Sequence, residues 1–338
     1  MFHYLITNRA MIQDEKGENY IREDGLDTAG EKNEPVHFAL FDSSQFRSNN
    51  SCRESLHLLP TLYEVKPMTS GDVLFYVHGY RTDLNMVLED ICSLEEKYIC
   101  EDSPVQIIVA ISWPARKNLL HYRDDAKDAI HSGKTFARNF DLLQKFIAAL
   151  YGNEGKGRIH LLAHSMGNRM LESLVLHLTL RQQKQSEAFL NEVILAAPDI
   201  DWHAFENGYA LYKLSLLCQR VTVYYNEEDV ALYLSQTVQN RHKRLGRHGF
   251  RDSKKVPQNV YAVDCTCIND LSNIVCHIIE HSYHTLSNYT IKDMIYVLKG
   301  TPTEQFLQYS LRMTKENDER RFVLKIEESL TQTVQTST

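Results

Sequence analysis

Short apolar runs alternate with longer amphipathic segments along the chain after residue 71. The runs are four to seven residues long, as expected for buried strands, and lie at 73–77, 105–111, 158–163, 193–197, 221–225 and 260–263. Apolar residues at helical spacing predict helices at 86–98, within 122–150, directly after residue 165, around 201–217, at 229–239 and over 290–315. Apolar strands that alternate with helices indicate an α/β fold, in which helices cover both faces of a mostly parallel sheet.

The two ends of the chain follow a different pattern. Residues 2–7 and 36–41 are short and aromatic-rich, and they predict two edge strands around a polar loop at 13–34. Residues 316–338 are charged and then rich in Thr, Gln and Ser, which predicts a helix end followed by a frayed tail. Because no repeat or linker interrupts the pattern, we expect residues 1–315 to form one domain.

Composition narrows the class of partner. The 338 residues are 43% hydrophobic and 24% charged, with a net charge of −7, so no general basic field favours nucleic acid. The local basic stretch 241–255 predicts a solvated loop, with an anionic partner as the alternative. No signal-peptide pattern and no apolar run of about 18 residues is present, so we expect a cytoplasmic protein without a membrane span.

Cysteine spacing favours neither a disulfide framework nor a metal site. The seven cysteines are an odd number without regular spacing, and Cys265-Thr-Cys267 is tighter than a zinc-binding C-x-x-C pair. Reduced, mostly buried thiols are therefore expected.

The chain around Ser165 carries the most specific chemical signal. The apolar run 158–163 leads into Ala163-His-Ser-Met-Gly167, and a helical pattern follows at once. This small-x-Ser-x-Gly arrangement between strand and helix is typical of a nucleophile elbow, where a sharp turn exposes the serine Oγ. The alternative is a serine that merely caps the helix.

Two backbone groups are candidates for an oxyanion hole. The strand 73–77 ends in Val77-His-Gly-Tyr80, where a glycine allows close approach of the loop, so we expect the Tyr80 N–H to donate. The N–H of Met166, which follows the serine, is the second candidate. His78 is expected to be structural and to hold its loop by hydrogen bonds.

The acid and the base should follow later strands, since the chain order in this fold is serine, acid, histidine. Asp229, after the strand 221–225, is the best acid, with Glu227, Glu228 and Asp199 as alternatives. The base should follow the strand 260–263, where His277, His281 and His284 all lie, and position alone does not choose among them. His164 adjoins the serine and is expected to point elsewhere.

Several segments together resemble one known family. They are Val77-His-Gly-Tyr80, Ser112-Trp-Pro114 with 122–124 (Tyr-Arg-Asp), 162–169 (Leu-Ala-His-Ser-Met-Gly-Asn-Arg), 196–201 (Ala-Ala-Pro-Asp-Ile-Asp), 223–232 and His281-Ser-Tyr283. In this order they resemble a group of uncharacterised α/β-hydrolases, the former domain of unknown function nine hundred, over roughly residues 70–290. The resemblance implies the α/β-hydrolase fold and a Ser165–Asp229–His281 triad, with no implied substrate.

We therefore expect a serine hydrolase that cleaves an ester, thioester or amide of a small acyl substrate through an acyl-serine, without a metal or organic cofactor. A carboxylesterase-like reaction is the leading expectation. Trp113 and the segment 115–135 are expected to shape the acyl pocket, with a core position as the alternative for Trp113. Two other functions compete: a non-catalytic binding scaffold on the same fold, and a zinc peptidase using His277-Ile-Ile-Glu-His281, which matches the H-x-x-E-H pattern.

Overall fold

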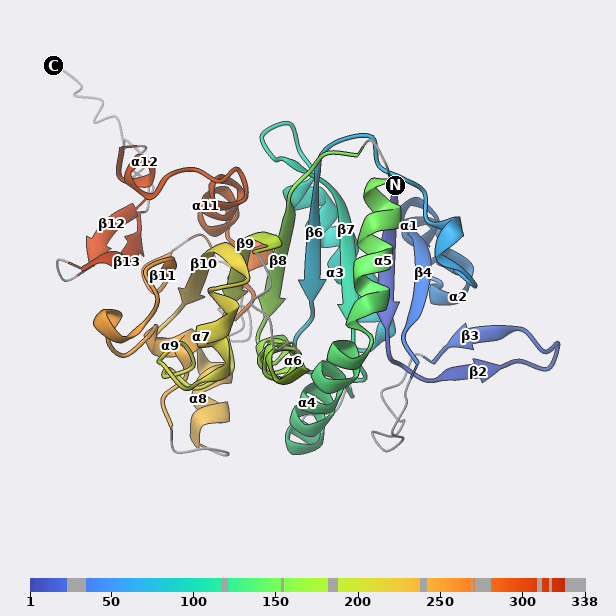
Figure 1. The fold of residues 1–338 in the computed structure, drawn as a ribbon, viewed down its shortest axis with the longest axis horizontal. Coiled ribbons are helices and arrows are strands. Elements are labelled where there is room, and N and C mark those ends of the chain that lie inside the picture. The colour runs from blue at the N-terminus through green and yellow to red at the C-terminus, as the bar shows by residue number, and fades with distance from the viewer. Residues whose placement is uncertain are drawn as a thin grey trace, which may run out of the picture.

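One large sheet forms the centre of the structure (Figure 1). The computed structural model describes residues 1–22, 35–116, 121–152, 155–181, 188–237, 242–268, 270, 281–308, 312–315 and 318–325. Within these residues eleven strands pair in the order β12-β13-β11-β10-β9-β8-β6-β7-β1-β4-β5. Their bounds are β1 Phe2–Thr7, β4 His37–Asp42, β5 Leu56–Leu58, β6 Asp72–Val77, β7 Val105–Ser112, β8 Ile159–His164, β9 Leu190–Ala196, β10 Cys218–Tyr225, β11 Val260–Asp264, β12 Arg312–Lys315 and β13 Asp318–Leu324.

The centre of the sheet is parallel, from β1 through β7, β6, β8, β9 and β10 to β11, and β13 continues it in parallel. Within the described part of this sheet, the antiparallel pairs lie at the flanks: β1 with β4, β4 with β5, and β12 with β13. Parallel strands place their carboxyl ends at one edge, and in Figure 1 the arrowheads of β6, β7 and β8 point to the same side. The α/β-hydrolase fold predicted from the sequence is thus confirmed.

Helices cover both faces of the sheet. One face packs on α4 (Tyr122–Arg138), α5 (Phe140–Tyr151) and α6 (Gly167–Arg181), and the other on α3 (Leu84–Tyr98) and α11 (Asn288–Leu298). Shorter helices are α1 Ser43–Asn49, α2 Cys52–Ser55, α7 Ala210–Leu214, α8 Val230–Ser235, α9 Leu245–His248, α10 Tyr283–Leu286 and α12 Thr303–Gln308, with 3-10 turns at Leu62–Glu64 and Ser253–Lys255.

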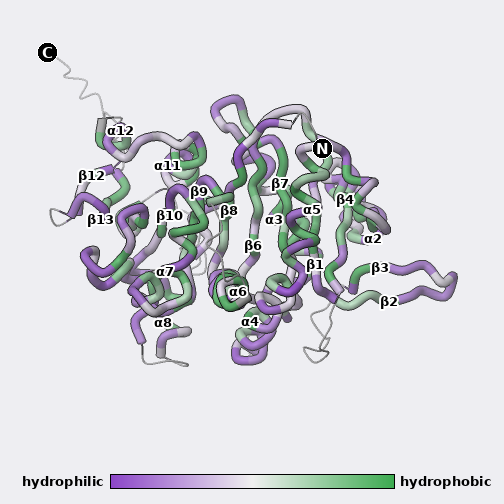
Figure 2. The backbone as a smooth tube through the Cα atoms, in the orientation of Figure 1, coloured by the Kyte–Doolittle hydropathy of each residue, from purple (hydrophilic) through white to green (hydrophobic). Residues whose placement is uncertain are grey.

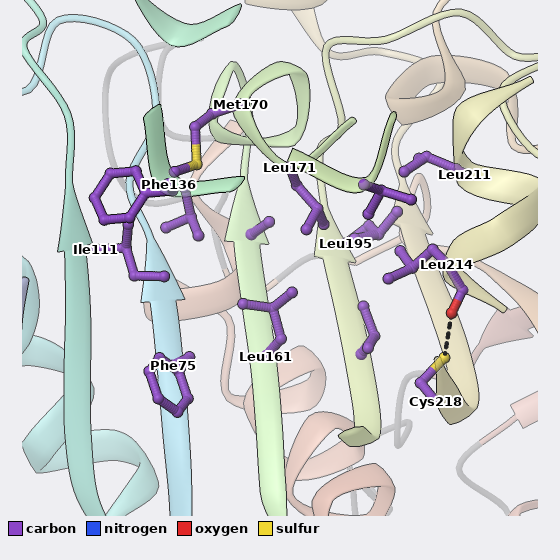
Figure 3. Close-up of a cluster of buried hydrophobic side chains, with 14 of the residues drawn as sticks. Phe75, Ile111, Phe136, Leu161, Met170, Leu171, Leu195, Leu211, Leu214 and Cys218 are labelled. Carbon is purple, nitrogen blue, oxygen red and sulfur yellow. Dashed lines mark hydrogen bonds between the residues drawn. The ribbon is translucent and has the colours of Figure 1, made fainter. Parts of the chain in front are cut away.

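Alternate residues of each buried strand enter separate cores. Along β6, Val73, Phe75 and Val77 face the α4–α6 side, whereas Leu74 and Tyr76 face the α3 side. Both faces are covered, so the central strands are apolar along their length, which Figure 2 shows as green tubes. Figure 3 shows one part of the α4–α6 core, where Phe136 and Met170 lie against side chains of β6, β7, β8 and β9.

The flanks of the sheet differ from the sequence prediction. The strands at 2–7 and 36–41 were expected at an edge, but β1 lies between β7 and β4, and β4 lies between β1 and β5. The single helix predicted over 290–315 is broken. α11 ends at Leu298 because Gly300, with φ +74°, and Pro302 follow it; α12 begins at Thr303, and residues 312–315 form β12. Residues 318–324, expected in the tail, form β13 and pair with β11.

Two loop predictions also change. Part of the polar stretch 13–34 belongs to a hairpin of β2 (Met11–Gln13) and β3 (Asn19–Ile21), which extends away from the sheet in Figure 1; residues 23–34 lie outside the described residues. Of the helix expected around 201–217, only α7 forms.

Candidate active site

Ser165 stands at the end of β8, directly before α6. Its backbone is left-handed, with φ +52°, and its N–H donates to Ala196 O on β9 at 3.0 Å. The turn is crowded: a Cβ on Gly167 would lie 2.5 Å from His78 O, and one on Gly79 would lie 2.9 Å from Ser165 Cβ. The glycine two residues after the serine is therefore required by the close approach of the loop after β6.

Asn168 fixes the same turn from within α6. Its side-chain amide donates to Ala163 O and to Ser165 O, both at 3.0 Å, and the residue is fully buried. These bonds hold the backbone of the turn to the first turn of α6, and Ser165 O also accepts from the backbone N–H groups of Asn168 and Asp199, at 3.1 and 3.2 Å. Sequence reasoning did not single out Asn168, although its place three residues after the serine is that of a side chain able to bond back to the turn.

Three side chains from distant parts of the chain meet at Ser165. The Ser165 Oγ lies 2.7 Å from His281 Nε2, and His281 Nδ1 lies 2.6 Å from Asp229 Oδ2. Ser165 is 5% exposed and Asp229 is fully buried. Burial acts to lower the pKa of His281, but the charge and hydrogen bond of Asp229, aided by Asp199, outweigh it and raise that pKa above its ordinary value.

Asp229 is held by the helix that it begins. It is the N-cap of α8, and its Oδ1 accepts from Leu232 N at 2.8 Å while Oδ2 faces His281. Its own N–H donates to Asn226 O at 3.2 Å. The carboxylate is therefore fixed by backbone groups and by the imidazole together.

Tyr283 anchors the histidine segment to the sheet. Its hydroxyl donates to Tyr224 O at 2.7 Å and accepts from Ala197 N at 2.8 Å, so it joins the segment to the ends of β9 and β10. His164 contributes a further contact, with its Nε2 3.1 Å from His281 O. His164 thus lies beside the His281 backbone and not at Ser165 Oγ.

The alternative acids and bases lie elsewhere. Glu227 and Glu228 are exposed, and Glu227 pairs with Lys315 at 3.0 Å. His284 is buried with its ring 4.1 Å from that of His164, and burial lowers its pKa to about 3. His277 lies outside the described residues, as does Glu280 of the zinc-peptidase pattern.

Asp199 belongs to a buried polar cluster beside the elbow. Its N–H donates to Ser165 O at 3.2 Å, while its carboxylate accepts from Ser235 Oγ at 2.6 Å and from the Tyr122 hydroxyl. Arg169 and Arg244 approach the same carboxylate at 3.5 and 3.3 Å. Burial acts to raise the pKa of Asp199, but the two arginines outweigh it and lower that pKa, so Asp199 is ionised and ties α4, α6 and α8 to the elbow.

The basic stretch 241–255 was predicted to be a solvated loop, but its middle is buried. Arg244 is 4% exposed and Leu245 is fully buried, while Gly246 N donates to Pro198 O at 2.9 Å. A Cβ on Gly246 would lie 2.5 Å from Ala197 C. The middle of this stretch is therefore packed against the site and is not a solvated loop.

The loop after β6 is supported by an aromatic stack. His78 lies parallel to Trp113 with ring centroids 5.0 Å apart, and Trp113 Nε1 donates to His78 O at 3.0 Å. Both side chains are fully buried, and burial with the nearby charge of Arg9 lowers the pKa of His78 to about 3. Trp113 packs against His78 of this loop and is part of the core. This is the alternative position given for Trp113 in the sequence analysis, where a pocket wall was expected.

The two predicted oxyanion donors are the residue after Ser165 and a residue of the loop after β6. Met166 is fully buried directly after Ser165. Tyr80 is half-buried, with its ring against that of Tyr122 at 5.3 Å. Burial, with the charge of Asp125, raises the pKa of the Tyr80 phenol to about 12, so its hydroxyl is neutral near pH 7.

Comparison with known proteins decides the family. The family model described as "Alpha/beta hydrolase of unknown function (DUF900)" matches residues 61–296, more than half of the chain. The chain belongs to this family. The matched range of the DUF900 hydrolases covers β6 to β11 and contains Ser165, Asp229 and His281.

Likeness to individual proteins is weak. None of the curated proteins searched matches the sequence significantly. Among solved structures, the iron-lacking apo form of ESTFA is 14% identical, with a TM-score of 0.34 and 78% of each chain covered. Phospholipase PlaB from Legionella pneumophila, in complex with thio-NAD, is 12% identical, with a TM-score of 0.32, covering 72% of this chain and 65% of that one.

The described residues contain neither a candidate membrane span nor a candidate metal cluster. No helix there is long and apolar enough to cross a bilayer. In the same part of the chain no group of three or more His, Cys, Asp or Glu side chains is arranged to hold a metal ion.

Proposed function

We propose that this DUF900 protein is a serine hydrolase that cleaves a carboxylic ester, or a related thioester or amide, through an acyl-serine. One observation carries the proposal: a continuous hydrogen-bonded chain runs from Ser165 Oγ through both nitrogens of His281 to buried Asp229, at 2.7 and 2.6 Å. Nucleophile and base within hydrogen-bond reach, with the base oriented by a third group, are the requirements for an activated serine. Membership of an α/β-hydrolase family supports the same reaction class.

The reaction would proceed in two halves. Ser165 Oγ attacks the substrate carbonyl carbon while His281 Nε2 takes the hydroxyl proton, and the tetrahedral oxyanion collapses as His281 returns that proton to the leaving group. Water then attacks the acyl-serine, again with His281 as base, which releases the acid and restores the Ser165 hydroxyl. Asp229 holds His281 in the tautomer with hydrogen on Nδ1 and stabilises the imidazolium.

The oxyanion would be held by backbone N–H groups of Tyr80 and Met166. Two placements support this assignment: Gly79, the neighbour of Tyr80, lies against Ser165, and Met166 is the residue between Ser165 and α6. A missing donor of this kind typically costs about 100-fold or more in kcat.

Covalent labelling tests the proposal. Purified protein is treated with a fluorophosphonate probe and assayed with p-nitrophenyl esters of increasing chain length, thioesters and peptides. We expect stoichiometric labelling on Ser165 and turnover of at least one ester, and we expect Ser165→Ala to lose both, by about 10⁶-fold in kcat.

Ser173→Ala is the matched control. Ser173 is also buried on α6, but its hydroxyl donates to Ile130 O at 2.6 Å, away from the triad. It should label and turn over like the wild type. A wild type that neither labels nor hydrolyses any of the substrates would favour the binding scaffold, and bound zinc without labelling would favour the peptidase.

A further inference from the structure

A buried arginine from the N-terminal strand lies close to the predicted oxyanion loop. Arg9 follows β1 by two residues and is 1% exposed, one of the largest fully buried side chains in the described structure. It belongs to residues 1–60, which precede the range matched by the family model. A buried guanidinium is costly unless its donors are well satisfied, so its position needs a physical explanation.

The guanidinium joins the ends of two neighbouring strands. Arg9 Nε donates to Ser112 Oγ at the end of β7, at 2.8 Å, and Nη2 donates to Thr82 O beyond β6, at 2.9 Å. The Arg9 backbone N–H donates to Thr7 Oγ1 at 3.0 Å, and that hydroxyl donates to Ser112 O at 2.8 Å. Arg9 is thereby fixed at its backbone and at its guanidinium.

One partner of the guanidinium, Thr82, is itself hydrogen-bonded to Tyr80. The Thr82 hydroxyl donates to Tyr80 O at 3.2 Å, and between them Arg81 is left-handed, with φ +62°. A turn with a strained residue persists only where the surroundings hold it. Arg9 holds the last residue of this turn, Thr82, by its hydrogen bond to Thr82 O.

The second partner of the guanidinium, Ser112, adjoins Trp113, which also supports the loop 78–82. Ser112 precedes Trp113, whose ring stacks on His78 and whose Nε1 donates to His78 O. One guanidinium therefore contacts both the loop 78–82 and the strand end that supports it. The position of a backbone donor at an oxyanion depends on such supports, because a displacement of about 1 Å costs up to 100-fold in rate.

We propose that Arg9 is a positioning residue that holds the loop 78–82 so that the Tyr80 N–H stays in place as an oxyanion donor. This role rests on the proposed serine hydrolase function. It gives the N-terminal segment, which lies outside the matched family range, a part in transition-state stabilisation.

The test compares Arg9→Lys and Arg9→Met with wild type in the full-length chain. We measure kcat and KM on the best ester, the inhibition constant of an alkyl boronic acid that forms a tetrahedral adduct with the serine, and amide exchange of residues 78–82. A lysine supplies the charge but not the two-armed geometry. We expect kcat to fall about 10- to 100-fold in both variants with KM within threefold, boronic acid binding to weaken in parallel, and exchange at 80–82 to rise.

Arg312→Met is the matched control for loss of a buried arginine. Arg312 is 2% exposed and pairs with Asp293 at 2.7 Å, between α11 and β12. It should lower the melting temperature but leave kcat and boronic acid affinity unchanged. Ser112→Ala, which removes only the acceptor of Arg9 Nε, keeps the test available if Arg9→Met does not fold, and should lower kcat with unchanged KM.

Three results would overturn the proposal. Arg9 variants that lose stability as Arg312→Met does, yet keep wild-type kcat and boronic acid affinity, would make Arg9 purely structural. If kcat falls but amide exchange at residues 80–82 is unchanged, the loss of kcat does not come from displacement of this loop. A wild type that the fluorophosphonate does not label would reject the proposed function itself, and this role with it, whatever the exchange shows.

Discussion

Asp229 has two carboxylate oxygens, and each has a separate partner. Oδ1 caps α8 through Leu232 N, and Oδ2 faces the His281 imidazole. Asparagine also caps helices well, so Asp229→Asn keeps the first contact and loses the charge needed for the second. The two tasks can therefore be separated by substitution.

Asp229→Asn should lower kcat by about 10⁴-fold with little change in stability, and Asp229→Ala should in addition lose about 1 kcal/mol of unfolding free energy. The pH profile gives a second measure. His281 must be neutral to act as base, and its raised pKa places the acidic limb of kcat/KM above pH 6.5, the ordinary histidine value. Removing the Asp229 charge lowers that pKa, so the limb should move to lower pH.

Glu228→Gln is the control, because Glu228 adjoins Asp229 but is exposed. It should leave both kcat and the limb unchanged. An acidic limb that stays at the same pH in Asp229→Asn would mean that Asp229 does not set the protonation of the base.

How well a residue could be predicted depended on how local its contacts are. Ser165 could be predicted as a candidate nucleophile because the nucleophile-elbow motif consists of five consecutive residues. Arg9 did not, because its partners Thr82 and Ser112 are 73 and 103 residues away and no local pattern links them. The position after the last strand did not separate His281 from His284, because both follow the same strand; the resemblance and the neighbouring hydroxyls favoured His281.

At the scale of elements, α4 and α6 pack unusually closely. A Cβ on Gly133 of α4 would lie 2.3 Å from Met170 O and 2.8 Å from Leu174 N, both backbone atoms of α6. Backbone cannot yield as a flexible side chain can. Since Ser165, the proposed nucleophile, directly precedes α6, this contact fixes the elbow relative to α4, which begins at Tyr122.

Gly133→Ala should therefore destabilise the protein, by about 1 to 3 kcal/mol, as overpacking does. Helix propensity alone would give the opposite sign, a gain of about 1 kcal/mol. Denaturant unfolding measures the difference, with Lys134→Ala on the same helix as a control expected within about 0.5 kcal/mol of wild type. A more stable Gly133→Ala would show that the two helices can separate at little cost.

The central strands were predicted correctly, whereas on the flanks β1 and β4 were predicted as strands but placed at an edge, and β12 and β13 were missed. The central strands are apolar along their length, and that pattern has one interpretation. In β13, by contrast, Phe322 and Leu324 are buried beside half-buried or exposed charged residues, so the sequence is typical of a tail.

At the scale of the whole molecule, the family-matched range is the middle of the sheet. Residues 61–296 contain the contiguous strands β11, β10, β9, β8, β6 and β7, while β1, β4 and β5 extend one flank and β13 and β12 the other. The second flank is tied to the centre by Arg312, which reaches Asp293 of α11 with two bonds of 2.7 and 2.8 Å, while the Tyr224 hydroxyl of β10 donates to the same carboxylate at 2.6 Å.

Asp293→Asn should be strongly destabilising, by about 3 to 5 kcal/mol, because it leaves a buried guanidinium without its counter-charge. The exposed pair Lys299–Asp102, at 3.5 Å, is the comparison: Asp102→Asn should cost no more than about 1 kcal/mol. Thermal unfolding of the two variants measures the difference. Equal losses would mean that the flank does not depend on this pair.

The left-handed backbone of Ser165 has a consequence for how activity and stability trade against each other. An L-residue in this conformation is strained by its Cβ, so Ser165, the proposed nucleophile, lowers the stability of the fold. Ser165→Ala and Ser165→Gly both lack the hydroxyl and should both be inactive, but only glycine relieves the strain. Ser165→Gly should therefore unfold at higher denaturant than Ser165→Ala, by up to about 1 kcal/mol after the greater chain entropy of glycine is counted. The most stable form of this elbow would then be one that evolution cannot use, because it has lost the reacting group.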